Sequence, residues 1–471
     1  MYDNGLFIFT RDLRIIDNVG LNQATKQCKQ LYTVFIFTPE QVSRNSFKSE
    51  NAVQFMIESL ESLEKSISEK GGKLITLYGN PDTLVKRLIA KYSIKAVFMN
   101  QEITPYGRKR FDEFKKICRS LDVVLEEYND YYLTEPDSVV TSSGSNYVKF
   151  TPYYNKIISE VKSNRIKIDK PQSTRIYKFA KPSSGLGEAI SLKEAMKRFG
   201  GRGSPQRLVH GGREEGLVKL RSIKQRVSDY EATRNDLEDE TTQLSAYIKF
   251  GNISIREAYY AFKEKLDKKA ADSLVRQLFW RDFYAQVLYN NPEVLFKAMN
   301  DKYRKIKWSN SKTLIDAWET GTTGYPIVDA GMREMLQTGY MHNRARLIVG
   351  SFLPKTLLVN WQDGEKHFAK TLTDYDPASN NGNWQWVAGS GADSQPYFRI
   401  LNPFLQSKKY DPDATYIKRW IPELRDVPAQ DIHKWDTVYK SYGDVKYPKP
   451  IVDYSSQKTK VLDAYNKALK S

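Results

Sequence analysis

The first 130 residues alternate short, continuous apolar runs with amphipathic segments. The apolar runs have strand length and lie at 6–9, 32–37, 74–78, 96–99 and 123–125. Continuous runs of this kind are typical of strands that are buried on both faces of a parallel sheet. The segments between them, such as 52–67 and 83–92, have helical spacing of apolar residues. The pattern predicts a doubly wound, parallel (Rossmann-like) α/β domain over residues 1–130.

The pattern changes twice further along the chain. Residues 131–225 are rich in Ser, Lys, Pro and Gly, which predicts a long connector with short helices. The glycine clusters at 200–203 and 211–212 complete neither a P-loop nor a dinucleotide fingerprint, so we interpret them as turns. From 226 to 471, apolar residues recur at spacings of three and four, and all eight tryptophans lie there. This part is predicted to be an all-α domain.

Composition narrows the class of protein. The chain has 73 Lys and Arg against 56 Asp and Glu, a formal net charge of +17, which favours a polyanionic partner such as nucleic acid. Two cysteines and four scattered histidines exclude a disulfide scaffold and predict no metal site. We expect neither a signal peptide nor a membrane span. The expectation is therefore an intracellular protein, with cytoplasm and nucleus both open.

Four stretches of the C-terminal part combine aromatic, amide, Arg and Asp side chains: 241–245, 277–284, 339–346 and 374–386. Taken singly, each has an ordinary interpretation as core, helix cap or solvated turn. A helix over 277–284 places Gln277 and Arg281 on one face, and hydroxyls near a helix start suit a phosphate. Together, the stretches fit a flat cofactor or a flipped base better than they fit four unrelated coincidences.

The chain resembles the photolyase/cryptochrome family of flavoproteins along its whole length. The motifs that carry the resemblance are 9–14 (FTRDLR), 324–330 (GYPIVDA), 396–403 (PYFRILNP) and 420–424 (WIPEL). Within that family, 341–346 (MHNRAR) and 380–386 (NNGNWQW) are most similar to class I photolyases, which repair cyclobutane pyrimidine dimers.

The resemblance implies FAD in the helical domain, active in its reduced anionic form. Residues expected at the phosphates, the ribityl chain and the flavin ring are Tyr230, Thr241, Thr242, Gln243, Leu244, Ser245, Gln277, Arg281, Asn343, Arg346, Asp374, Asp376 and Asn380. Among them, Arg346 and Asp374 match a pair beside the isoalloxazine ring, and Asn380 matches a position near its N5.

The implied reaction is light-driven electron donation from the flavin to a flipped dimer in UV-damaged DNA, which splits the dimer. Trp280 and Trp386 match the aromatic groups that flank the dimer. Arg344 and Arg399 match DNA contacts, and Asn343 matches a dimer contact. A tryptophan chain that carries electrons from the surface to the flavin is expected at Trp384, Trp361 and Trp308.

Gln277 departs from the class I pattern, in which Glu binds the dimer bases. Gln is typical of (6-4) photolyases and animal cryptochromes, but the paired histidines of (6-4) enzymes would fall at Asn343 and Leu347. Without them a (6-4) product lacks its general acid, so a cyclobutane-dimer enzyme is favoured over a (6-4) photolyase. A cryptochrome-type photoreceptor without repair, and a non-enzymatic DNA-binding protein, are further alternatives.

Two further expectations concern an antenna chromophore in the N-terminal domain and the oligomeric state of the chain. The run at 102–108 (EITPYGR) resembles members with a deazaflavin-type antenna more than those with folate, and an empty antenna site is the alternative. The family pattern also implies a monomer.

Overall fold

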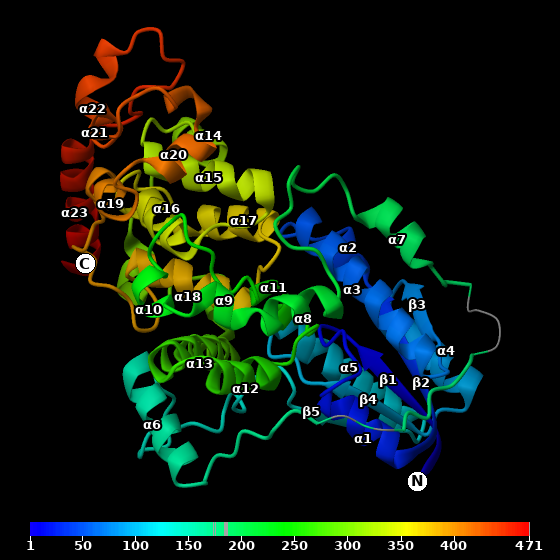
Figure 1. Cartoon of the computed structure of the whole chain (residues 1–471). Coiled ribbons are helices and arrows are strands. Elements are labelled where there is room, and N and C mark those ends of the chain that lie inside the picture. Colours follow the sequence, from blue (N-terminus) through cyan, green and yellow to red (C-terminus); the bar gives the residue numbers. More distant parts are fainter. Residues whose placement is uncertain (173, 175, 183–186, 471) are drawn as a thin grey trace.

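The computed structural model describes residues 1–172, 174, 176–182 and 187–470. A sheet-containing part and a larger helical part lie on opposite sides of the molecule, and α8 and α11 lie between them (Figure 1). Among the described residues, no helix has the length and apolarity that crossing a membrane requires.

The strands are β1 (Tyr2–Phe9), β2 (Cys28–Phe37), β3 (Leu74–Tyr78), β4 (Ala96–Asn100) and β5 (Val124–Tyr128). The helices up to the end of the connector region are α1 (Val19–Gln27), α2 (Pro39–Val42), α3 (Glu50–Glu69), α4 (Pro81–Tyr92), α5 (Pro105–Ser120), α6 (Phe150–Lys162), α7 (Leu192–Phe199), α8 (Arg213–Arg221) and α9 (Ile223–Val227).

The helical part continues with α10 (Tyr230–Thr233), α11 (Ser245–Lys249), α12 (Ile255–Lys265), α13 (Lys268–Asn290), α14 (Lys312–Thr320), α15 (Pro326–Thr338), α16 (Asn343–Lys355), α17 (Trp361–Thr371), α18 (Pro377–Ala388), α19 (Pro403–Tyr410), α20 (Thr415–Trp420), α21 (Ala429–Ile432), α22 (Trp435–Val438) and α23 (Tyr454–Lys470). Short 3-10 turns are η1 (Pro292–Leu295), η2 (Asp301–Lys305), η3 (Pro422–Leu424) and η4 (Tyr439–Ser441).

The five strands form one parallel sheet in the order β3-β2-β1-β4-β5. One face packs Leu6 and Ile8 against α4 and α5, and the other packs Phe7 and Phe9 against α1, α3 and the helical part. Both faces are therefore covered, which is why the strands are apolar at consecutive positions. The predicted doubly wound α/β fold joined to a helical domain is confirmed.

The predicted strand positions are correct, but β1 and β2 begin earlier than their apolar runs. Tyr2–Phe9 includes the polar Asp3 and Asn4, which belong to the strand because the β1 backbone pairs with β2 from Tyr2 onward. The backbone N–H and C=O groups of a strand pair in the same way whether the side chains are polar or apolar. At an exposed strand end the side chains can be polar, so an apolar run indicates only the buried part of a strand.

The segment 131–225 packs against both parts of the molecule. Phe150 and Tyr153 of α6 and Phe199 of α7 belong to the same apolar core as Phe7 of the sheet and Leu278 of α13. Residues 173, 175 and 183–186 of this segment lie outside the described residues.

A buried cluster of charges joins the carboxyl end of β1 to the helical part. Asp130 accepts hydrogen bonds from Arg14 at 2.7 Å and from Arg256, near the start of α12, at 2.8 Å. Arg256 also pairs with Asp17 at 3.0 Å. All four side chains are buried. Although burial opposes ionisation of Asp130, the two guanidinium groups lower its pKa below the usual value.

We expect Asp130→Ala to destabilise the protein by about 3–5 kcal/mol, because it leaves Arg14 and Arg256 buried without their shared anion. Chemical unfolding followed by circular dichroism measures the loss. Asp3→Asn, which removes the exposed partner of Lys29, should leave the unfolding midpoint unchanged. A similar midpoint for the two variants would contradict the role of the cluster.

Candidate active site

A cavity of about 370 Å³ lies in the helical part, enclosed by α10, α11, α13, α16 and α18. Its wall includes eleven of the thirteen residues predicted to bind the cofactor: Tyr230, Thr242, Leu244, Ser245, Gln277, Arg281, Asn343, Arg346, Asp374, Asp376 and Asn380. The other two lie beside the wall. Thr241 hydrogen-bonds to the wall residue Tyr340 at 3.1 Å, and Gln243 accepts from Lys219 at 2.8 Å.

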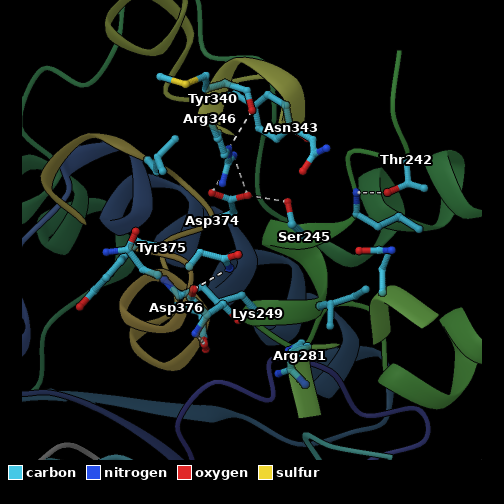
Figure 2. Close-up of a pocket in the computed structure, with 18 of the residues that line it drawn as sticks. Thr242, Ser245, Lys249, Arg281, Tyr340, Asn343, Arg346, Asp374, Tyr375 and Asp376 are labelled. Atoms are coloured by element: carbon cyan, nitrogen blue, oxygen red, sulfur yellow. Dashed lines mark hydrogen bonds and ion pairs between the residues drawn. The ribbon is translucent and has the colours of Figure 1, made fainter. Parts of the chain in front are cut away.

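An ion pair and a hydroxyl group meet on one side of the cavity. Arg346 Nη2 lies 3.0 Å from Asp374 Oδ2, and the Ser245 hydroxyl donates to the same oxygen at 2.7 Å (Figure 2). Arg346 Nε also donates to the Met341 carbonyl at 2.8 Å. These bonds fix the guanidinium from two sides, so its orientation is set before any ligand binds.

Asp376 occupies another edge of the cavity and caps α18, where its Oδ1 accepts from the Ser379 amide at 3.0 Å. Its Oδ2 accepts from Arg11 of the β1 loop at 2.9 Å. Burial opposes ionisation, but Arg11 and Arg281 lower the pKa of Asp376 to about 2. The carboxylate is therefore a permanent anion and joins the sheet part to the cavity.

The amide of Asn380 is oriented by the neighbouring helix. Its Nδ2 donates to the backbone carbonyl of Glu365 at 3.0 Å, while the adjacent Asn381 donates to the Glu365 carboxyl at 2.9 Å. Burial raises the pKa of Glu365 to about 7. One amide hydrogen of Asn380 is thus committed to α17, which leaves its other hydrogen and its oxygen for the cavity.

Comparison with known proteins decides the family. Residues 6–172 match the family model "DNA photolyase", and residues 274–467 match "FAD binding domain of DNA photolyase". A deoxyribodipyrimidine photo-lyase from Alkalihalophilus pseudofirmus is 34% identical, over 97% of this chain and 96% of the relative.

The chain belongs to the DNA photolyase family.

Solved structures agree with this membership. An archaeal photolyase from Sulfolobus tokodaii, described as containing two FAD molecules, superposes with a TM-score of 0.87 at 37% identity, covering 98% of this chain and all of the other. A cryptochrome from Synechocystis superposes with a TM-score of 0.88 at 27% identity, covering 98% and 99%. FAD is accordingly the cofactor of this photolyase-family chain.

The four residues predicted to contact DNA are not part of the cavity wall. Trp280 stacks on Phe150 with ring centroids 3.7 Å apart, and the Trp386 carbonyl accepts from Gln395 at 3.3 Å. Arg344 lies over the Tyr410 ring at 4.2 Å. Burial and the charges of Arg234 and Arg399 lower its pKa, so these arginines lie close enough to repel one another.

The three tryptophans predicted as an electron path occupy different depths. Trp384 is buried in the cavity wall, Trp361 is buried at the start of α17, and Trp308 is half-buried against Tyr465 at 6.0 Å. The ring of Trp384 also lies near that of Trp318, with ring centroids 6.0 Å apart.

Several wall residues were missed by the sequence analysis. Lys249 lies one turn after Ser245 on α11, so the spacing of four would have placed it on the same face. Burial and the charge of Arg11 lower its pKa to about 7. Tyr340, Tyr375 and Ser379 lie inside two of the four stretches that the sequence singles out, but they were not among the predicted cofactor residues, although all three line the cavity.

A second cavity, of about 490 Å³, lies at the carboxyl ends of β1, β2 and β4. Its wall contains Phe9 and Phe35, and Glu102 pairs there with Arg110 at 2.5 Å. Thr104 and Pro105 of the predicted antenna run also line it. Lys249 and Tyr375 border both cavities, so only a thin wall separates the two.

Gly364 provides a structural test of the Trp384 position. A methyl group at residue 364 would lie 2.2 Å from Trp384 Cη2. Gly364→Ala should therefore push the indole into the cavity and lower the FAD content. Flavin absorbance per mole of protein measures the effect. Gly443→Ala, where nothing lies within 4 Å of the new methyl group, should retain FAD fully. Equal FAD content in both variants would contradict close packing at Gly364.

Proposed function

We propose that this chain is a light-driven DNA repair enzyme that splits cyclobutane pyrimidine dimers and acts as a monomer inside the cell. The observation that carries the proposal is that a residue of the cofactor cavity is followed directly by an arginine that has two further arginines near it. Asn343 lines the cavity, while the next residue, Arg344, shares a positive field with Arg234 and Arg399. Damaged DNA held by the arginines would place a flipped pyrimidine dimer at the cavity.

The side chains in the cavity suit FAD. Arg281 has a buried Nη2 with no hydrogen-bond partner among the described residues, which is an unused donor for an anionic group. Thr242 and Ser245 offer hydroxyls, and Asn380 and Asn383 offer amides that both donate and accept. This donor and acceptor set matches phosphates, ribityl hydroxyls and flavin ring edges.

Each predicted cofactor residue then has a simple task. The segment 241–245 with Tyr230 would hold the phosphates and the ribityl chain, and Arg346 with Asp374 would hold the ring. Asn380, oriented by its hydrogen bond to α17, would offer its free amide hydrogen and oxygen to the edge of the ring. When bound and reduced, FAD supplies the electron that splits the dimer after absorbing blue or near-UV light, and the electron then returns. Trp308, Trp361 and Trp384 serve to pass an electron inward when the cofactor must first be reduced.

The DNA residues divide into charged and neutral groups. Arg344 and Arg399 neutralise backbone phosphates, an interaction that is salt-dependent and independent of base sequence. Trp280 and Trp386 offer aromatic faces to the flipped bases. Because Phe150 covers one face of Trp280, that indole has a single face left for stacking.

Gln277, Asn343 and Leu347 favour a cyclobutane dimer over a (6-4) product. All three line the cavity, and none is an acid or a histidine. Splitting a cyclobutane ring needs no general acid, whereas rearranging a (6-4) product does. An amide at 277 still binds base edges through one donor and one acceptor, but it cannot give a proton.

We also propose that the second cavity holds a planar antenna chromophore, of deazaflavin or flavin type rather than folate. Its aromatic wall suits a flat ring, and the guanidinium groups of Arg11 and Arg110 with the amine of Lys249 suit an anionic one. The thin wall shared with the FAD cavity keeps the two ligands close.

The proposal is tested by illuminating the reduced protein with DNA that contains cyclobutane dimers. We expect recovery of pyrimidine absorbance, and no repair of DNA that contains (6-4) products in a parallel sample. Binding without any recovery on the first substrate would favour a cryptochrome-type role. Recovery only on the second would favour a (6-4) photolyase.

Gln277→Glu tests the departure from the class I pattern. We expect the repair yield per absorbed photon to stay equal or to rise, because a protonated carboxyl group still hydrogen-bonds to the dimer bases and can also give them a proton, which an amide cannot. Quantum yields of the pre-reduced proteins measure this, and Gln277→Leu, which removes all hydrogen bonding, should lower the yield. A large loss in the Glu variant would show that the amide has a different role.

A further inference from the structure

A tight turn at residues 396–399 carries an exposed aromatic ring next to a predicted DNA contact. The Arg399 amide donates to the Pro396 carbonyl at 3.0 Å, which closes the turn. Phe398, at the third position, is 64% exposed. Tyr397 points the other way and stacks on Tyr465 of α23, with ring centroids 6.1 Å apart. The turn therefore presents Phe398 and Arg399 outward.

One buried ammonium group holds both ends of this turn. Lys355 is the last residue of α16 and is 0% exposed. Its Nζ donates to the Pro396 carbonyl at 3.3 Å and to the Arg399 carbonyl at 3.2 Å. Helix α16 begins at Asn343, which lines the cavity. At its other end, Lys355 hydrogen-bonds to the turn that carries Arg399.

Burial of the charged Lys355 side chain costs free energy of folding. Among the described residues, no carboxylate lies within 4.0 Å of its Nζ, and burial together with the charge of Arg399 lowers its pKa to about 8. A buried cation without an anion is destabilising relative to an apolar side chain of similar volume. Stability of the fold therefore does not explain a lysine at this position.

We propose that Lys355 is a positioning residue for DNA binding: its ammonium group fixes the turn that presents Phe398 and Arg399, and DNA binding favours its protonated state. The inference rests on the proposed function, since it assumes that Arg399 meets a DNA phosphate. A phosphate at Arg399 would offset the charge that now opposes protonation of Lys355. By linkage, a ligand that favours the protonated state binds more weakly when the proton is lost.

The pH range follows from the groups around Lys355. Apart from burial, the charged group that acts on Lys355 is the Arg399 guanidinium of the turn. The affinity for dimer-containing DNA should therefore be full below pH 8 and should fall as pH rises through 8 and above. A charge-assisted hydrogen bond is about twice as strong as a neutral one, so we expect a decrease of about fivefold between pH 7 and pH 9.5.

The experiment measures the affinity of the FAD-loaded protein for dimer-containing and undamaged DNA from pH 7 to 9.5. Lys355→Met should bind damaged DNA about fivefold more weakly at pH 7, without the pH dependence, while its melting temperature stays equal or rises. Lys355→Arg keeps the charge at every pH and should lose the pH dependence but keep most of the affinity. Lys73→Met, which removes an exposed lysine from the sheet part, should behave as wild type.

The outcomes separate this inference from the proposed function. A wild-type protein without preference for damaged DNA would overturn the proposed function itself. A clear preference, combined with the same affinity and pH profile in Lys355→Met as in wild type, would overturn the role of Lys355 alone. If the Met variant does not fold, a wild-type pH profile in Lys355→Arg would overturn it equally.

Discussion

The ion pairs at the carboxyl end of β1 join the sheet, the helical part and the wall of the cofactor cavity. Asp17 connects the β1 loop to Arg256 of α12 directly, Arg14 does so through Asp130, and Arg11 connects the loop to Asp376 at the cofactor cavity. In a parallel sheet all strands end at the same edge, so the loops there are the natural place for ligands. These charges are largely buried, so the loss of one removes a counter-charge from a buried partner. The two cavities consequently share one rigid support.

The charges of the molecule have two separate uses. The excess positive charge of the whole chain suits a polyanion, whereas a few cations are enclosed at defined points where they orient other groups. Arg346 is held between Asp374 and the Met341 carbonyl, and Lys355 lies between two turn carbonyls. Net charge indicates only the first use. The second depends on burial, which a composition does not contain.

The sequence was sufficient for the fold class and for most of the cavity wall. Apolar runs located all five strands, since strands buried on both faces leave a clear signal, and motif resemblance brought together Tyr230, Gln277, Arg346 and Asn380 from distant positions. The sequence did not identify residues whose function depends on tertiary contacts. Lys249 and Lys355 stand at helix ends, where a lysine usually meets solvent. Only the packing of α11 and α16 against other segments shows that both are enclosed.

The continuous apolar core has a consequence for synthesis on the ribosome. Phe7 and Phe9 of β1 share one core with Leu278 and Val287 of α13, which are about 280 residues later in the chain. At ordinary elongation rates the nascent sheet must wait on the order of tens of seconds before its second face is covered. During that interval it exposes phenylalanines of β1 and β2. The newly made N-terminal part is thus a natural substrate for chaperones that bind apolar surfaces, and the ion pairs of Asp17 and Asp130 with Arg256 can form only when α12 emerges.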